Sequence, residues 1–233
     1  MNQGYPYPVI APGAAVDSRA RFIVRTYNHL FCAILGFAGI EFALFKTGAA
    51  YAMAHAMLST SWLLVLGGFR LVSWLASHAA HTATSKGVQY LALGGFVTAE
   101  AIIFVPLLVI ANLKAPGAIQ SAGIVTMLGF AGLTAVAFTT RKDFSFLGAI
   151  LRWAFIVALV LIVAGAIFGF QLGTFFSVVM IGLAGAAILY DTSNVLHHFP
   201  EDRYVAASLQ LFSSVALMFW YVLRLFLQLQ SRD

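Results

Sequence analysis

The sequence predicts an all-α membrane protein, a bundle of seven transmembrane helices that forms one domain. Hydrophobic residues make up 61% of the chain and charged residues only 9%, a composition typical of integral membrane proteins. The apolar residues occur in runs of about twenty, long enough as helices to cross about 30 Å of hydrocarbon. The sequence lacks the alternation of apolar and polar residues over strand-length segments that is typical of a membrane β-barrel. The solvent of most of this chain is therefore lipid.

The chain begins with residues 1–20, which we expect to be a flexible cytoplasmic tail because they contain several prolines and no apolar run. Basic residues then precede a full-length span instead of a short apolar segment with a cleavage site, so no cleaved signal peptide is expected. Residues 21–233 are predicted to form the transmembrane domain. Its seven spans, joined by short loops, are placed at 22–46, 53–77, 87–112, 118–139, 146–169, 173–196 and 204–229.

The distribution of Lys and Arg predicts the orientation, because positive loops stay on the cytoplasmic side during insertion. The N-terminus is expected in the cytoplasm and, with an odd number of spans, the C-terminus outside. The net charge of +5 reflects this topology and does not indicate a nucleic-acid partner. On the predicted cytoplasmic side lie Arg19, Arg21, Arg25, Lys86, Arg141, Lys142 and Arg203, against Lys46, Lys114 and Arg232 on the other.

Enzyme and cofactor motifs are not found in the sequence. A phosphate-binding loop, HExxH and GxSxG are all missing. The single cysteine, Cys32, excludes an intrachain disulfide and a cysteine-based zinc site. The sequence therefore predicts a protein that is not an enzyme and that has no cofactor, except for a possible calcium ion.

Charged residues inside the predicted spans are the main candidates for function. An Asp or Arg at a helix centre costs roughly 2.5–3.5 kcal/mol on insertion, so each needs a partner, a wet cavity or a route to the interface. Because successive spans run in opposite directions, their depths in the membrane can be compared. Six such residues stand out: Glu41, Arg70, Glu100, Arg152, Asp191 and Arg224.

Three of these residues, Arg70, Glu100 and Asp191, fall at depths that allow one shared inward-facing pocket. Arg70 with Asp191 would be either a structural ion pair that fixes helix register or part of a gate or ion pathway. Glu100 lies six residues before Pro106, whose missing N–H frees a carbonyl that could line a cavity. Both interpretations stay open for all three residues.

The remaining three lie closer to the membrane surfaces. Glu41 and Arg224 fall toward the outer ends of their spans, and we expect an outer ion pair with a structural role. Arg152 is about one turn inside its span, from where its guanidinium can reach the interface.

The stretch "AILYDTSNVLHHF" at 187–199 places several polar groups on one helix. Asp191, Asn194 and His198 are spaced i, i+3 and i+7, so a continuing helix presents them on one face. His197 and His198 are candidates for pH sensing, although a His at a helix C-terminus is also favoured by the helix dipole alone.

Two further polar features are expected to be structural. The last span has a polar stripe that should be buried against other helices. In "TTRKDFSFLGAIL", Asp143 or Ser145 is expected to cap the following helix by accepting free N–H groups of its first turn. The stripe consists of Gln210, Ser213, Ser214, Tyr221 and Arg224.

Three motifs carry a resemblance to a known family. The segments "RTYNHLF", "TTRKDFSFLG" and "GAAILYDTSNVLHHFPEDRYVAASLQLF" resemble the Bax-inhibitor family of membrane proteins, in particular its bacterial YccA-like branch, from about residue 19 to the end. The resemblance implies seven helices with the last one central, a cytoplasmic N-terminus and a place in the inner membrane.

Two functions follow from the resemblance. Members of the YccA-like branch resemble modulators of the membrane protease FtsH, to which residues 1–20 would be offered. In another branch the proteins are pH-sensitive calcium leak channels, in which the aspartate matching Asp191 pairs with a second aspartate and is latched by an arginine. Ser214 stands at the second position here, so the carboxylate pair is missing, while Arg70 could still act as the latch and Asp191 could bind calcium transiently.

The modulator is the function we expect, with the leak channel as the alternative. Glu100 could replace the missing acid of the carboxylate pair. A third class, an intramembrane hydrolase that uses Asp191 and Glu100, lacks the paired Asp motif that such enzymes need.

Overall fold

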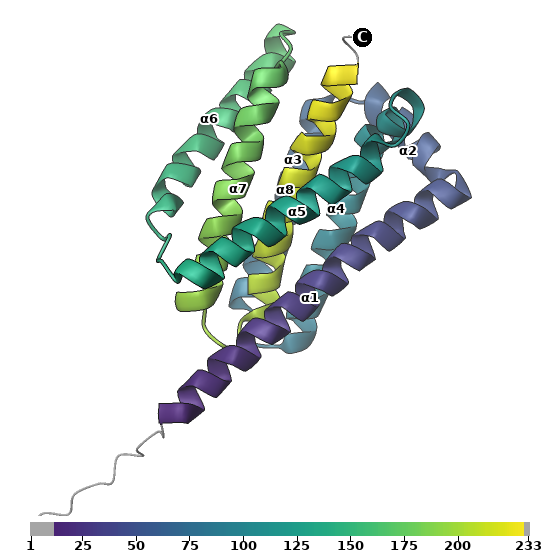
Figure 1. The fold of residues 1–233 in the computed structure, drawn as a ribbon. Helices are drawn as coiled ribbons and strands as arrows, with labels where there is room; N and C mark the ends of the chain where they lie inside the picture. Colours follow the sequence, from purple (N-terminus) through teal and green to yellow (C-terminus); the bar gives the residue numbers. More distant parts are fainter. Residues whose placement is uncertain (1–11, 231–233) are drawn as a thin grey trace, which may run out of the picture.

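The computed structural model describes residues 12–230, and their side chains from residue 17 onward. Helices joined by short loops account for these residues, and the described part of the chain contains no strand (Figure 1). The helices are α1 (Pro12–Thr47), α2 (Ala49–Ser59), α3 (Trp62–Thr82), α4 (Lys86–Lys114), α5 (Ala118–Thr140), α6 (Leu147–Phe168), α7 (Thr174–His197) and α8 (Tyr204–Gln230).

Seven helices of the described residues, all except α2, are long and apolar enough to cross a membrane. The predicted all-α bundle of seven transmembrane helices is therefore confirmed. The first helix begins earlier than predicted, at Pro12, so only residues 1–11 of the predicted tail lie outside the described residues.

The second predicted span, 53–77, is wrong in its boundaries. The apolar stretch that suggested one helix is divided into α2 and α3. Between them Thr60 has extended backbone angles and Ser61 also leaves the helical region. The membrane-spanning helix is α3, which runs from Trp62 to Thr82.

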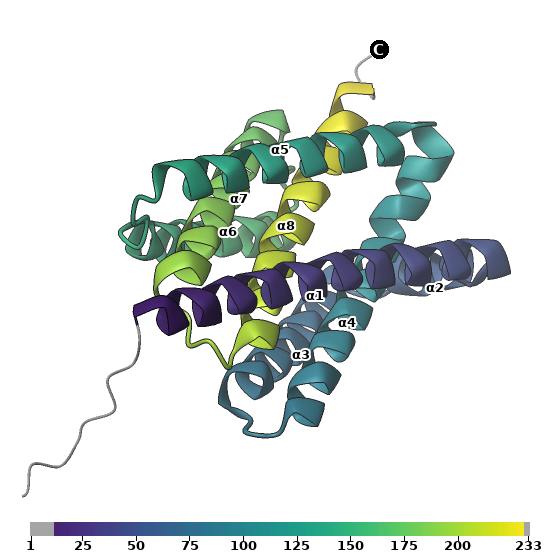
Figure 2. The ribbon, with the colours of Figure 1, turned by 60° about the horizontal axis from the view of Figure 1, so that its bottom comes forward.

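The last helix is the core of the bundle, as the resemblance implied. Helix α8 is the most buried of the seven candidate spans, and α1, α3, α4, α5 and α7 all pack against it. Figures 1 and 2 show α1 and α5 crossing α8 obliquely, with α6 on the outside next to α7. The packing of α5 and α7 on α8 is close, because Gly129 and Gly185 lie against the side chain of Met218.

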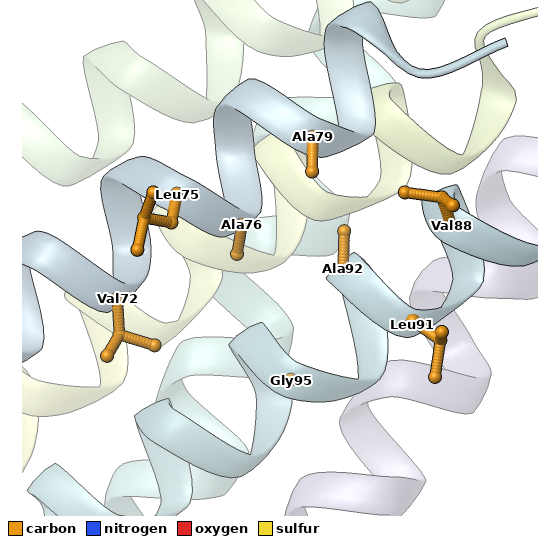
Figure 3. A pocket seen from close by; sticks show the side chains of 8 residues that line it. All are labelled: Val72, Leu75, Ala76, Ala79, Val88, Leu91, Ala92 and Gly95. Carbon is orange, nitrogen blue, oxygen red and sulfur yellow. The ribbon is translucent and has the colours of Figure 1, made fainter.

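The outer faces of the bundle are apolar, as expected for contact with lipid. Among the described residues, Leu91 is 77% exposed and Phe175 is 82% exposed. A hollow of about 340 Å³ between α3 and α4 is lined only by aliphatic residues and glycine, so it offers no polar chemistry (Figure 3). Its lining consists of Val72, Leu75, Ala76, Ala79, Val88, Leu91, Ala92 and Gly95.

Candidate functional site

The candidate site lies where α7 packs on α8, around the carboxylate of Asp191. Asp191 is 4% exposed and Ser214 is 8% exposed. The Ser214 hydroxyl donates a hydrogen bond of 2.5 Å to Oδ2 of Asp191, and the Gln210 amide donates one of 2.6 Å to Oδ1. Gln210 and Ser214 are four residues apart and therefore share one face of α8. Each carboxylate oxygen has its own donor.

This arrangement explains how a carboxyl group is accommodated in the interior. Burial without hydrogen bonds is costly for such a group, and bonds to a carboxylate are stronger than those between neutral groups. Both donors are neutral and both come from α8. The site thus ties α7 to α8 by hydrogen bonds, as the bond of 2.8 Å from the Ser177 hydroxyl to Oε1 of Gln228 does nearer the other end of α7.

The predicted contact between Arg70 and Asp191 is not present. Arg70 is exposed on α3, and among the described residues it forms no salt bridge. The physical reason is the path of the helix: α3 packs on α4 and α8, and within the described part of the chain it does not contact α7. In this conformation Arg70 therefore does not latch Asp191.

The structure also does not bring Glu100 to Asp191. Glu100 is buried on α4 with an exposure of 7%, and in the described part of the chain it forms no hydrogen bond or salt bridge with Asp191. Both oxygens of Asp191 are instead bonded by residues of α8. Glu100 therefore does not take the place of a second acid at this site.

The predicted outer pair of Glu41 and Arg224 is not formed either. Glu41 is buried on α1, and neither of its carboxylate oxygens has a hydrogen-bond partner among the described residues. Arg224 instead donates a hydrogen bond of 3.0 Å to the carbonyl of Leu172, in the loop before α7. Gln228 donates to the same carbonyl at 3.2 Å. The Arg224 guanidinium thus bonds a loop carbonyl and not the carboxylate of Glu41.

A second polar cluster joins the loop before α6 to the end of α7. His198 Nε2 lies 3.0 Å from Oδ2 of Asp143, and the Phe144 N–H donates to the Ser193 hydroxyl at 2.9 Å. Oδ1 of Asp143 accepts the Ser145 N–H at 2.8 Å. That bond above all, with smaller contributions from the Ser145 hydroxyl and His198, lowers the pKa of the Asp143 carboxyl below its ordinary value of 3.8.

The capping prediction for this loop needs a correction. Asp143 accepts an N–H of the turn before α6, not one from the first turn of the helix. The residue at the cap position is Phe146, and Ser145 contributes no side-chain cap. The other candidate sensor, His197, contacts the carbonyl of Ser193 one turn earlier at 3.0 Å.

Arg19 has a role that the sequence interpretation missed. Its guanidinium donates to the carbonyls of Val195, Leu196 and Phe199, at 2.8, 3.1 and 2.5 Å. The last carbonyls of a helix lack partners within the helix, so Arg19 of α1 closes the end of α7. In the sequence Arg19 was counted only as a positive charge. The signal that could have found it is the need of these carbonyls for a basic partner.

These observations define a class, a polytopic helical membrane protein with a buried carboxylate between its last two helices. Comparison with known proteins identifies the family. The family model described as "Inhibitor of apoptosis-promoting Bax1" matches residues 19–232. The chain belongs to this family, the Bax inhibitor-1 family, as the motifs predicted.

Individual relatives match a shorter part of the chain. The "Modulator of FtsH protease YccA" of Escherichia coli K12 is 37% identical over 109 residues, which cover 46% of this chain and 49% of that protein. The protein PA2604 of Pseudomonas aeruginosa is 36% identical over 111 residues, with the same shares. The "Inner membrane protein YccA" of E. coli O6:H1 is also 37% identical over 109 residues, with the same shares. The chain thus spans about half the length of the curated relatives it matches.

Proposed function

We propose that this protein is a non-enzymatic, multi-pass protein of the bacterial inner membrane that modulates a membrane protease of the FtsH type. The observation that carries the proposal is the 37% identity to a relative named as a modulator of FtsH protease. Membership of the Bax inhibitor-1 family and the seven candidate spans agree with it.

The mechanism follows from how a protease must process a membrane protein. Residues 1–11, which precede α1, are offered as an entry point in the cytoplasm, and the protease pulls on the attached bundle. Arg19 opposes this pull at the first helix, because it is bonded to three carbonyls at the end of α7. The central, buried α8 opposes it for the whole bundle. A protease occupied with such a chain degrades other membrane substrates more slowly.

The test separates the tail from the helix that follows it. Deletion of residues 2–11 removes the entry point but keeps Arg19, whereas deletion of residues 2–20 would remove both. We expect the shorter deletion to restore the degradation rate of a second membrane substrate in a reconstituted FtsH assay. The control replaces residues 2–11 with an unrelated sequence of equal length, which should keep the inhibition. Unchanged substrate degradation after the deletion would contradict the proposal.

The alternative is a pH-sensitive calcium leak with Asp191 on the ion pathway and the histidines at 197 and 198 as sensors. The buried, hydrogen-bonded carboxylate of Asp191 favours it. Arg70 would have to leave its exposed position on α3 to act as the latch. Calcium flux into liposomes with the purified protein, compared with Asp191→Asn, tests this function. Equal flux at every pH for both proteins and for empty liposomes would exclude it.

A further inference from the structure

A group of basic and aromatic side chains from three helices meets at one end of the bundle, outside the site around Asp191. We call it the interfacial cluster: Arg25 and His29 from α1, Lys86 and Tyr90 from α4, and Tyr204 from α8. Lys86 and Tyr204 are the first residues of their helices. The starts of α4 and α8 and the N-terminal half of α1 lie at the same end in Figure 1.

The aromatic rings of the cluster are held by contacts with one another. His29 stacks on Tyr90 with ring centres 5.5 Å apart, and its centre lies 5.1 Å from that of Tyr204. The hydroxyls of Tyr90 and Tyr204 are 3.1 Å apart, and Nε2 of His29 lies 3.2 Å from the Tyr90 hydroxyl. Nδ1 of His29 is 2.6 Å from the carbonyl of Arg25. The rings therefore form an ordered platform.

Two cations lie against this platform. The Lys86 ammonium is 4.4 Å from the centre of the Tyr204 ring, and the Arg25 guanidinium is 5.6 Å from it. An aromatic face attracts cations, but it does not neutralise their charge. The two positive charges near this ring repel each other, and an anion between or beside them offsets the repulsion.

Within the described residues, neither cation has a carboxylate partner. Lys86 donates only to neutral oxygens, the side chain of Gln89 at 3.3 Å and the backbone carbonyl of Asp202. The carboxylate of Asp202, the nearest acid to Tyr204 in the chain, pairs instead with Arg203 at 3.3 Å. Arg25 forms no salt bridge in this part of the chain. The cluster thus has a net positive charge that an external anion can balance.

The position of the cluster, at the ends of membrane spans, indicates which kind of anion is abundant around it. Tyrosines and basic residues at the ends of membrane spans lie at the level of the lipid headgroups, and Tyr90 is 43% exposed there. A phosphate accepts hydrogen bonds from guanidinium and ammonium groups together. We propose that the interfacial cluster binds the phosphate of an anionic phospholipid, with Arg25 and Lys86 as its two cationic contacts and Tyr204 as the ring that positions them.

The experiment measures lipid bound to the intact protein. The full chain is reconstituted in nanodiscs of phosphatidylcholine with a fraction of phosphatidylglycerol and released for native mass spectrometry. We expect one retained phosphatidylglycerol. Each cation near an anionic surface contributes about fivefold in affinity, so Arg25→Gln with Lys86→Gln should lower retention by more than tenfold.

A matched control removes the same charge from the same end. Arg21 and Lys142 are exposed and contact no ring in the described part of the chain, so Arg21→Gln with Lys142→Gln should change retention by less than about twofold. Equal losses in both double variants would mean general surface attraction and would overturn the proposal. So would retention that does not change in the first.

Two further measurements test whether misfolding explains the loss of lipid and whether the ligand is a soluble phosphate. Exchange of the two cations, Arg25→Lys with Lys86→Arg, keeps both charges near the anionic surface and should keep retention within about threefold of the wild type. Loss of retention in this variant, with unchanged thermal unfolding, would overturn the role of charge. Inorganic phosphate at millimolar concentration should not displace the lipid. Displacement would overturn the assignment to a lipid and indicate a site for free phosphate.

Discussion

The carboxylate of Asp191 depends on donors from a single neighbouring helix. Ser214 and Gln210 each bond one of its oxygens, and no cation takes part in the described structure. A neutral donor stabilises a carboxylate by hydrogen bonding alone, so the interaction needs short distances and does not act over a long range. Removal of one donor is therefore expected to have a local and measurable effect.

Ser214→Ala leaves Oδ2 of Asp191 buried without its donor. A buried acceptor left unsatisfied costs about 1–3 kcal/mol, and we expect the free energy of unfolding in detergent to fall by that amount. Ser213→Ala is the control, because Ser213 is the adjacent residue and forms no hydrogen bond in the described structure. Equal stability of both variants would show that the Ser214 hydroxyl does not hold the carboxylate.

The lowered pKa of Asp143 predicts that the stability of the protein decreases at acid pH. Its pKa is lower in the folded protein than the ordinary value of 3.8, chiefly because it accepts the Ser145 N–H. The stabilisation is therefore complete above the ordinary value and is lost as the pH falls through the lower, folded value. The melting temperature of the wild type should fall more steeply than that of Asp143→Asn from about pH 5 to about pH 3. Parallel curves would contradict this.

At the scale of single residues, the sequence identified the important positions better than their partners. Its polar spacing predicted that Asp191 points into the bundle, and the family resemblance implied that Ser214 stands at the position paired with it. The predicted contacts of Arg70 with Asp191 and of Glu41 with Arg224 were wrong. Successive residues of a helix point about 100° apart, so the partner of a side chain depends on the rotation of two helices, which hydropathy does not determine.

Among the elements, α6 is the least integrated into the bundle. It packs mainly on α7 and touches α3 slightly, and Ala158 joins it to a small buried cluster with Met180 of α7 and Tyr221 of α8. Near the start of α6, Gly148 lies close to Tyr190 of α7. A methyl group on Gly148 would lie 2.8 Å from the Tyr190 ring, closer than carbon atoms can pack.

Gly148→Ala should therefore loosen α6. Overpacking of this kind typically costs about 1–3 kcal/mol, and we expect lower thermal stability together with faster hydrogen exchange in residues 147–158. Gly132→Ala on α5 is the control, because nothing lies within 4 Å of the position its methyl would take. If the two variants have the same stability, the contact of Gly148 with Tyr190 does not hold α6.

The helices show where sequence patterns reach their limit. Long apolar runs predicted five of the seven spans to within two residues at each end, because hydrocarbon demands them. The break between α2 and α3 escaped prediction, since it occurs at Thr60 and Ser61, and Ser or Thr inside an apolar run is common in membrane helices. The chain there turns without a proline or glycine to mark it.

For the whole molecule, the charge distribution makes the topology testable. We predict a cytoplasmic N-terminus and an external C-terminus from the bias of Lys and Arg. Alkaline phosphatase fused after Gln230 should be active, because this enzyme folds only outside the cytoplasm, whereas the same enzyme inserted after Lys142 should be inactive. The opposite pattern would reverse the orientation and move the proposed protease contact to the wrong side of the membrane.

The order of synthesis gives the central position of α8 a further consequence. Because the ribosome makes Tyr204–Gln230 after the other six spans, those spans must wait in the bilayer with their inner faces uncovered until α8 has been made. A nascent chain that stalls before this point leaves Asp191 without the two donors that α8 supplies. The entry of α8 into the bundle therefore distinguishes a stalled chain from one in which all seven spans are assembled.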